Sequence, residues 1–164
     1  MNRRPADVPE DASPQVPWLS VVFGFGPMLP LLAGAAAAWA LPGEPRGLVL
    51  TLTLLWACGI LMFLAGVRRG LSFRTRGGPT LVQMATMLGL YGTGFCALVA
   101  VEAGRPLAGT VLLLVGYGAL VCLDPLAAES GEAPRHFARL RPAQIPLALL
   151  SLAALLALEI ARAP

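Results

Sequence analysis

The sequence of 164 residues contains no lysine, a single histidine and few charged residues of either sign. Charged residues make up 13% of the chain, whereas soluble domains carry about 25%. A soluble chain of this length could not bury a composition that is 57% hydrophobic within one core. All twelve basic residues are arginine, which indicates a GC-rich, bacterial genome. The composition therefore excludes an ordinary soluble domain.

The sequence also has few cysteines and no cysteine motif typical of a metal or redox site. Cys58, Cys96 and Cys122 lie within or at the edge of apolar segments, and they form neither a CxxC motif nor a Cys/His spacing suited to a metal. Cysteine in such surroundings usually acts as a small hydrophobic residue. We therefore expect no disulfide framework, metal or cofactor. His136 has no Ser/His/Asp or Cys/His set around it, so the sequence assigns no catalytic residues.

Long apolar stretches are what the sequence has in abundance. Five of them cover residues 18–41, 48–67, 81–101, 107–123 and 143–160. A bilayer core about 30 Å thick takes roughly 20 apolar residues of helix, with about 17 as a practical minimum. We therefore predict an all-α, polytopic membrane helix bundle of five transmembrane helices, formed by residues 18–164 as a single domain. Residues 1–17, which hold four prolines and five charges, are expected to be a disordered polar tail.

The first apolar stretch also admits a second interpretation, a cleaved signal peptide. Arg3 and Arg4 provide a basic start, and Ala38-Trp39-Ala40 resembles a small-residue cleavage site. However, acidic residues follow the arginines, and the stretch has 24 residues rather than a core of about 7–15. The sequence therefore favours a retained span.

The arginines are divided unevenly between the two sides of the predicted bundle. Nine lie in the N-terminal tail and in the second and fourth loops, and three lie in the first and third loops and after the last span. The positive-inside rule places the side with nine arginines in the cytoplasm, with the N-terminus. Because the positions of the arginines reflect the orientation of the spans in the membrane, the net charge of +3 does not indicate a nucleic-acid partner. We predict a multi-pass protein of a bacterial inner membrane.

Two prolines interrupt the first span. Pro27 and Pro30, with Gly26 before them, each remove a backbone donor and clash with the preceding turn. In lipid, the freed carbonyls must find partners in protein or in a water-lined cavity. The pattern favours a kink that shapes packing. The alternative is a hinge or a binding site formed by unwound backbone.

Small residues recur at helical spacing in the second and third spans. They are Gly59, Gly66 and Gly70 in the second, and Ala85, Gly89, Thr93 and Cys96 or Ala97 in the third. Seams of small residues let helix backbones approach closely in a membrane. We expect these positions to be packing faces within the bundle, with contacts between copies of the chain as the alternative.

The charged residues near the membrane lie at the ends of the spans. Arg68 and Arg69 end the second span and Asp124 ends the fourth, and both spans run toward the same side. Because an unpaired charge at the edge of lipid is costly, we predict that one of these arginines pairs with Asp124. Glu159 lies near the chain end with Arg162 three residues on, which predicts a solvated helix end.

The fourth loop ends in a basic segment from Pro134 to Pro142. Phe137 and Leu140 are three residues apart and would share one helical face, while Arg141 and its neighbouring arginines would reach anionic lipid headgroups. Such attraction amounts to about 1 kcal/mol per arginine close to the surface. We expect an interfacial turn that anchors the last span on the inner surface. The alternative is a docking site for a protein partner.

Three short motifs are spread along the spans. They are the stretch 58–70 (CGILMFLAGVRRG), the pair Gly26-Pro27, and Asp124 followed by Gly131, Pro134, Phe137 and Leu140-Arg141. Together they resemble the domain-of-unknown-function family 3429, although Arg69 stands where that family often has tryptophan. The resemblance implies a small multi-pass protein of bacterial inner membranes with a mitochondrial transmembrane relative. It implies no established activity, so no catalytic residues are carried over.

The sequence thus predicts a non-enzymatic protein that packs against, assembles or stabilises a larger membrane complex. Its expected partners are the lipid bilayer, anionic headgroups, and a membrane protein or a second copy of the chain. The alternative is a small transporter that uses the proline-containing first helix, with Gln83, Thr86 and Thr93 as its few polar candidates. A membrane-embedded enzyme ranks third, because proton transfer and nucleophilic attack need positioned partners.

Overall fold

Five helical segments of the chain are long and apolar enough to cross a membrane. In the computed structural model they are Val22–Ala40, Gly43–Ser72, Leu81–Glu102, Pro106–Asp124 and Ala143–Ala161. The structure describes the backbone of residues 18–73, 78–129 and 135–162, and the side chains of residues 18, 22–73, 78–124 and 143–162. The predicted all-α, polytopic bundle with five spans is therefore confirmed. The predicted disordered tail, residues 1–17, lies outside the described residues.

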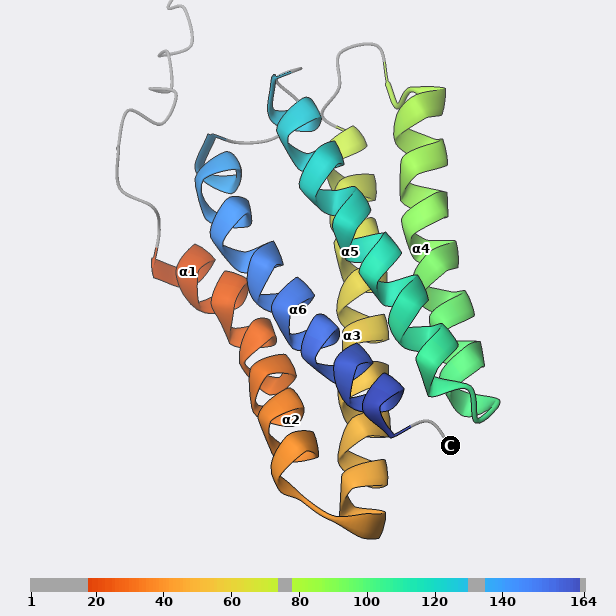
Figure 1. The fold of residues 1–164 in the computed structure, drawn as a ribbon. Coiled ribbons are helices and arrows are strands. Elements are labelled where there is room, and N and C mark those ends of the chain that lie inside the picture. The colour runs from red at the N-terminus through yellow and green to blue at the C-terminus, as the bar shows by residue number, and fades with distance from the viewer. Residues whose placement is uncertain (1–17, 74–77, 130–134, 163–164) are drawn as a thin grey trace, which may run out of the picture.

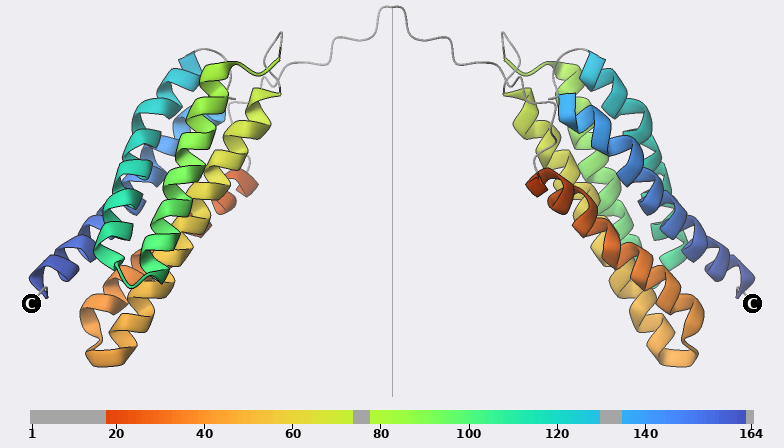
Figure 2. Two further views of the ribbon diagram at one scale, coloured as in Figure 1. Left: turned by 90° about the vertical axis from the view of Figure 1, so that its right-hand side faces the viewer. Right: turned by 90° about the vertical axis from the view of Figure 1, so that its left-hand side faces the viewer.

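The helices run up and down in chain order (Figure 1). The elements are α1 (Trp18–Phe25), the 3-10 turn η1 (Gly26–Met28), α2 (Leu29–Ala40), α3 (Gly43–Ser72), α4 (Leu81–Glu102), α5 (Pro106–Glu129) and α6 (Arg135–Ala161). Consecutive helices from α3 to α6 pack side by side, and α2 packs against both α3 and α6. The ends of α3 and α5 lie at one end of the bundle, and the end of α6 lies at the other with the α2–α3 and α4–α5 turns (Figures 1 and 2).

The turn between α4 and α5 shows how local sequence forces the chain to reverse. Gly104 adopts φ +72°, a left-handed conformation that glycine takes without steric cost. The Arg105 N–H donates to the Ala100 carbonyl at 2.9 Å, and the Gly104 N–H donates to Val101 at 3.0 Å, which is a Schellman motif. Pro106 then begins α5, where its missing N–H has no helical partner to lose. The two helices are therefore antiparallel neighbours.

Several helices extend beyond the predicted apolar stretches. Helix α3 starts at Gly43 and ends at Ser72, and thirty residues of helix measure about 45 Å, longer than a bilayer core of about 30 Å. Hydropathy marks only the part of a helix that lies in hydrocarbon, so the expected boundaries were too narrow. Helix α6 likewise starts at Arg135. The basic segment before the last span is therefore helix continuous with that span rather than a turn, and its anchoring on the inner surface stays a prediction.

The first span bends without unwinding (Figure 2). Helix α1 ends at Phe25 and α2 begins at Leu29, with only the single 3-10 turn between them. Pro30 lacks the N–H that would bond to Gly26, and the Leu29 N–H donates to the Gly26 carbonyl instead. On α3, the indole N–H of Trp56 donates to the Pro27 carbonyl at 2.9 Å. The bend is a kink that α3 stabilises, and no unwound backbone forms a binding site there.

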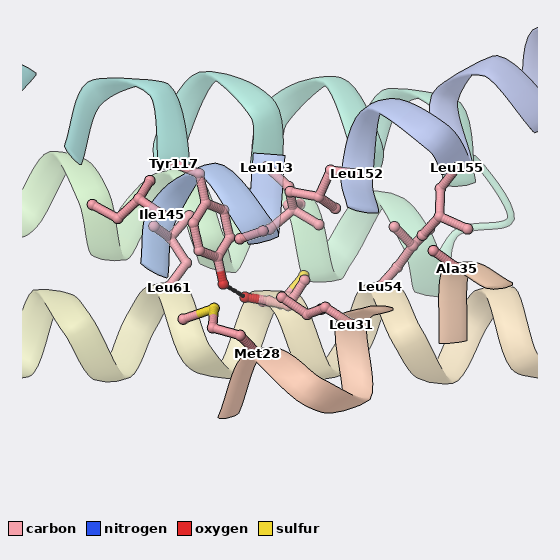
Figure 3. Packing of buried hydrophobic residues seen from close by; sticks show 14 of the residues in the cluster. Met28, Leu31, Ala35, Leu54, Leu61, Leu113, Tyr117, Ile145, Leu152 and Leu155 are labelled. Carbon is pink, nitrogen blue, oxygen red and sulfur yellow. Dashed lines mark hydrogen bonds between the residues drawn. The ribbon is translucent and has the colours of Figure 1, made fainter. Parts of the chain in front are cut away.

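The core lies where α2, α3, α5 and α6 meet (Figure 3). Tyr117 of α5 is the largest fully buried side chain, and its hydroxyl donates to the Ala57 carbonyl of α3 at 3.0 Å. A buried phenol needs such a partner, because its hydroxyl has no water to bond to. At the other edge of the bundle, the indole N–H of Trp39 donates to the Ala154 carbonyl of α6 at 3.0 Å. These bonds fix the helices relative to one another.

Candidate functional site

An ion pair joins α3 and α5 at the end of the bundle. Arg68 Nη1 lies 2.8 Å from Asp124 Oδ1, and the two side chains are only 13% and 14% exposed. Because α3 and α5 run in the same direction, Arg68 and Asp124, which stand in the C-terminal parts of their helices, reach the same end of the bundle (Figure 1). The predicted pairing of an arginine with Asp124 is confirmed, and Arg68 is the arginine involved.

The neighbouring Arg69 takes a different role. Its guanidinium stacks over the Phe73 ring at 4.1 Å, and its Nη1 donates to the Ser72 hydroxyl at 3.1 Å. Among the described residues, Arg69 forms no ion pair. The positive charge of Arg69 is therefore not neutralised by a carboxylate within the part of the chain that the structure describes.

Glycines form the close helix crossings, but at positions other than those predicted. A β-carbon at Gly94 of α4 would lie 2.9 Å from Met62 Cγ and 3.4 Å from the Cys58 carbonyl oxygen of α3. A β-carbon at Gly109 of α5 would lie 3.2 Å from the Ala97 carbonyl oxygen. Similar crowding occurs at three further glycines, against a neighbouring side chain in each case: Gly24 against Gln144, Gly34 against Thr53, and Gly116 against Leu61.

The glycines expected in the packing faces are open. A β-carbon at Gly59, Gly66, Gly70 or Gly89 would meet no atom within 4 Å, and the same is true of Gly26 in the proline-containing turn. The prediction that Gly66, Gly70 and Gly89 form packing faces within the bundle is therefore wrong. Spacing along the sequence identified which residues share a helical face, but it could not indicate which face turns toward a neighbouring helix.

The open glycines of α3 belong to one continuous outward face. We call this face the α3 outer stripe, and define it by Leu52, Trp56, Gly59, Phe63, Gly66 and Gly70, all of which are exposed. Their spacing of four and three residues places them on one side of a helix with 3.6 residues per turn. Phe63 is 63% exposed, between glycines on either side. The stripe combines large apolar side chains with short stretches of accessible backbone.

The polar residues suggested for a transporter bond within their own helix. Gln83 and Thr80 form a capping box at the start of α4, with bonds of 2.9 and 3.2 Å. The Thr86 hydroxyl donates to the Gln83 carbonyl, and the Thr93 hydroxyl donates to the Gly89 carbonyl. Backbone carbonyls of α4 thus satisfy these hydroxyls, as is common for threonine in membrane helices. No observation brings these three residues together at a common site.

Glu159 differs from its prediction as a solvated helix end. Both of its carboxyl oxygens are buried and lack a hydrogen bond, and Arg162 is exposed and not paired with it. Thr110 belongs to the first turns of α5, the helix that packs against α6. The Thr110 hydroxyl is also fully buried and without a partner. Nearness to the chain end suggested exposure, but both carboxyl oxygens of Glu159 are buried in the folded bundle.

The remaining candidate positions give no further site. Pro134 lies outside the described residues, as do the side chains of Phe137, Leu140 and Arg141. In the described part of the chain, no three histidine, cysteine, aspartate or glutamate side chains are grouped to hold a metal ion. All three cysteines are free thiols, with Cys58 buried and the other two exposed.

Comparisons of the chain with family models, curated proteins and solved structures found no match. The resemblance to family 3429 therefore stays a prediction. What the fold defines is a multi-pass, all-α membrane bundle whose described residues include a part-buried ion pair and a glycine-containing outward face.

Proposed function

We propose that this protein is a non-enzymatic component of a bacterial inner-membrane complex. In this proposal the α3 outer stripe binds a transmembrane helix of another membrane protein, and the bundle stabilises or assembles that complex. The observation that carries the proposal is the openness of Gly59, Gly66 and Gly70, where a β-carbon would meet nothing within 4 Å. The predicted family resemblance and the arginine distribution support the membrane assignment.

Open glycines in a long helix are unfavourable unless something approaches them. Glycine in a helix interior is about 1 kcal/mol less favourable than alanine. Where the bundle itself needs close approach, as at Gly94, the glycine faces a neighbouring helix. Gly66 and Gly70 form a small-xxx-small pair, but a β-carbon at either position meets no atom of the bundle within 4 Å. Close packing of a partner helix, through dispersion contacts along the backbone, would compensate for these glycines.

Charge favours a different protein over a second copy of the chain as the binding partner of the α3 outer stripe. Copies inserted the same way would bring their α3 helices together in parallel. A crossing at Gly66 and Gly70 would then bring two Arg69 guanidiniums to the same level, and like charges at an interface are unfavourable by several kcal/mol. Arg69 forms no ion pair within the described residues. A partner helix with small residues and an acidic side chain at this level fits the stripe better.

Photo-crosslinking in native membranes identifies the protein that contacts the α3 outer stripe. A photoreactive phenylalanine analogue replaces Phe63 in the full chain, and the matched control replaces Val115 of α5, which is 61% exposed where Phe63 is 63%. The expected result is a crosslink from position 63 to one transmembrane helix of another protein, with an acidic residue near the level of Arg69, and none from position 115. A crosslink to a second copy, or to lipid alone, would overturn the proposal.

Leucine variants provide the second arm. Gly66→Leu and Gly70→Leu should each reduce the crosslink at least tenfold without loss of folding, because their β-carbons meet no atom of the bundle. Gly118→Leu on α5 is the matched control, since a β-carbon there also meets nothing within 4 Å, and it should leave the crosslink unchanged. Undiminished crosslinking in both stripe variants would rule out close approach at these glycines.

A further inference from the structure

A second feature lies on the other side of the bundle from α3, between α5 and α6, and does not depend on the proposed function. Glu159 stands in the last turn of α6, and Thr110 stands about one turn into α5. Neither the two carboxyl oxygens nor the Thr110 hydroxyl is accessible, and none has a hydrogen bond. Helices α5 and α6 pack side by side, and α5 begins at the end of the bundle where α6 ends (Figure 1). A buried carboxyl and a buried hydroxyl, neither of which has a hydrogen bond, therefore lie near the same end of two adjacent helices.

The ionised form of Glu159 is unfavourable in these surroundings. A carboxylate is an acceptor only and needs donors, and the one polar neighbour available is a single hydroxyl. Burying an unpaired charge is very unfavourable, and a carboxyl placed in such surroundings stays neutral instead. The neutral form has an O–H of its own to donate. It can bond to Thr110 Oγ1, and the Thr110 hydroxyl can then donate to a carbonyl of the preceding turn.

No described cation compensates a negative charge at this position. Helix α6 packs against α5, α2, α1 and η1, and α1, η1 and α2 contain no charged residue. Arg162, after α6, and Arg105, before α5, are both exposed. On α5, Asp124 is fourteen residues beyond Thr110, about 21 Å along the helix, and is paired with Arg68. Tyr117 of α5 donates to α3.

We propose that Glu159 and Thr110 form a proton-binding site, in which the Glu159 carboxyl holds a proton at neutral pH and donates it to Thr110 Oγ1. The proton joins α5 to α6 at this end of the bundle. Loss of the proton leaves an unpaired carboxylate between the two helices, so alkaline conditions weaken their contact. An intramembrane carboxyl that takes up and releases a proton is a functional element rather than a packing residue.

A hydrophobic carbodiimide reports on the site, because it reacts with neutral carboxyls in apolar surroundings. The acid adds across one C=N bond: its oxygen bonds to the central carbon and its proton moves to nitrogen. The acyl group then shifts to nitrogen and gives a stable N-acylurea, so nothing leaves and nothing is oxidised. The experiment treats the full chain in liposomes with dicyclohexylcarbodiimide and locates the added mass by peptide mapping. Glu102, which is exposed, is the internal control.

The expected result at pH 7 is at least tenfold more labelling of Glu159 than of Glu102, with labelling of Glu159 lost as the pH is raised. Equal labelling of the two residues, or none at Glu159, would overturn the proposal. Protection of Glu159 by sodium chloride but not by choline chloride would also overturn it, because the ligand would then be a metal cation.

The neutral isostere Glu159→Gln provides a second readout. Its amide can donate to Thr110 Oγ1 as the protonated carboxyl does, but it does not ionise. Between pH 7 and pH 9.5, the wild-type unfolding equilibrium constant should rise at least tenfold more than that of the variant. If the unfolding equilibrium constants of the wild type and the variant changed in parallel with pH, the result would contradict a proton at this site. Labelling of the wild type decides the question by itself if the variant does not fold.

Discussion

Replacing Asp124 by asparagine should destabilise the bundle strongly, because it leaves Arg68 buried without its counter-charge. The Arg68 Nη1–Asp124 Oδ1 distance is 2.8 Å, and both side chains are less than one-sixth exposed. Removing one partner of a buried ion pair costs about 3–5 kcal/mol. Since the pair lies at the end of the bundle with slight solvent access, we expect the lower value. A loss of about 3 kcal/mol raises the unfolding equilibrium constant more than a hundredfold.

The double-mutant cycle isolates the pair from the other contacts of Asp124. Arg68→Gln and Asp124→Asn are measured singly and together by reversible unfolding in detergent micelles titrated with sodium dodecyl sulfate. The double variant should be about 2 kcal/mol more stable than the sum of the two single effects predicts. Each single variant leaves one charge without its partner, whereas the double variant contains neither charge. Arg69→Met is the control. It removes a stacking contact of about 0.5–1 kcal/mol at the same helix end.

Additive effects in this cycle would refute the reasoning. So would a cost for Asp124→Asn below that of Arg69→Met, since the adjacent arginine stacks on Phe73 and forms no ion pair within the described residues. Either result would mean that water or detergent headgroups solvate Arg68 as well as Asp124 does.

Three further predictions concern the crossings, the core and the orientation. Gly94→Leu should cost about 1–3 kcal/mol by overpacking against Met62, whereas Gly118→Leu should stay within about 0.5 kcal/mol of wild type; equal costs in micelle unfolding would contradict the crossing. Tyr117→Phe should cost about 1 kcal/mol through loss of the hydrogen bond to α3, and an unchanged unfolding midpoint would exclude that contribution. A reporter fused to the C-terminus should be located outside the cytoplasm, because nine arginines lie on the opposite side of the bundle and three on this side. A cytoplasmic signal from the reporter would contradict the predicted orientation.

Some parts of the site could be predicted from the sequence because they depend on helix direction alone. Arg68 and Asp124 each follow an apolar stretch of a span that runs the same way, so their levels in the membrane are fixed before any packing is known. The choice between Arg68 and Arg69 is different, since it depends on the rotation of α3 about its axis. Consecutive residues point about 100° apart on a helix. Only the packed structure turns Arg68 toward α5 and leaves Arg69 over Phe73.

The errors have a related cause. The recurrence of Gly66, Gly70 and Gly89 identified small faces, but a membrane helix is apolar on all sides, so no polar face distinguishes outside from inside. The glycines that α3 does approach closely, Gly34, Gly94 and Gly116, were not among the residues that recurred at helical spacing. Glu159 was misjudged in the same way. Its place near the chain end sets its depth along α6, but its burial depends on how the helices of the folded bundle cross.

The sequence by itself determined the number of spans, their alternating direction and the charges at their ends. These follow from the length of apolar runs, from the antiparallel geometry that short loops impose, and from the division of arginines between the loops. The tertiary structure alone decided which side of each helix is covered. It turned Gly66 and Gly70 outward, closed Gly94 against α3, and buried Glu159 and Thr110. Rotation and crossing of uniformly apolar helices are set by side-chain shape at each contact, and a single sequence carries no periodic signal of that shape.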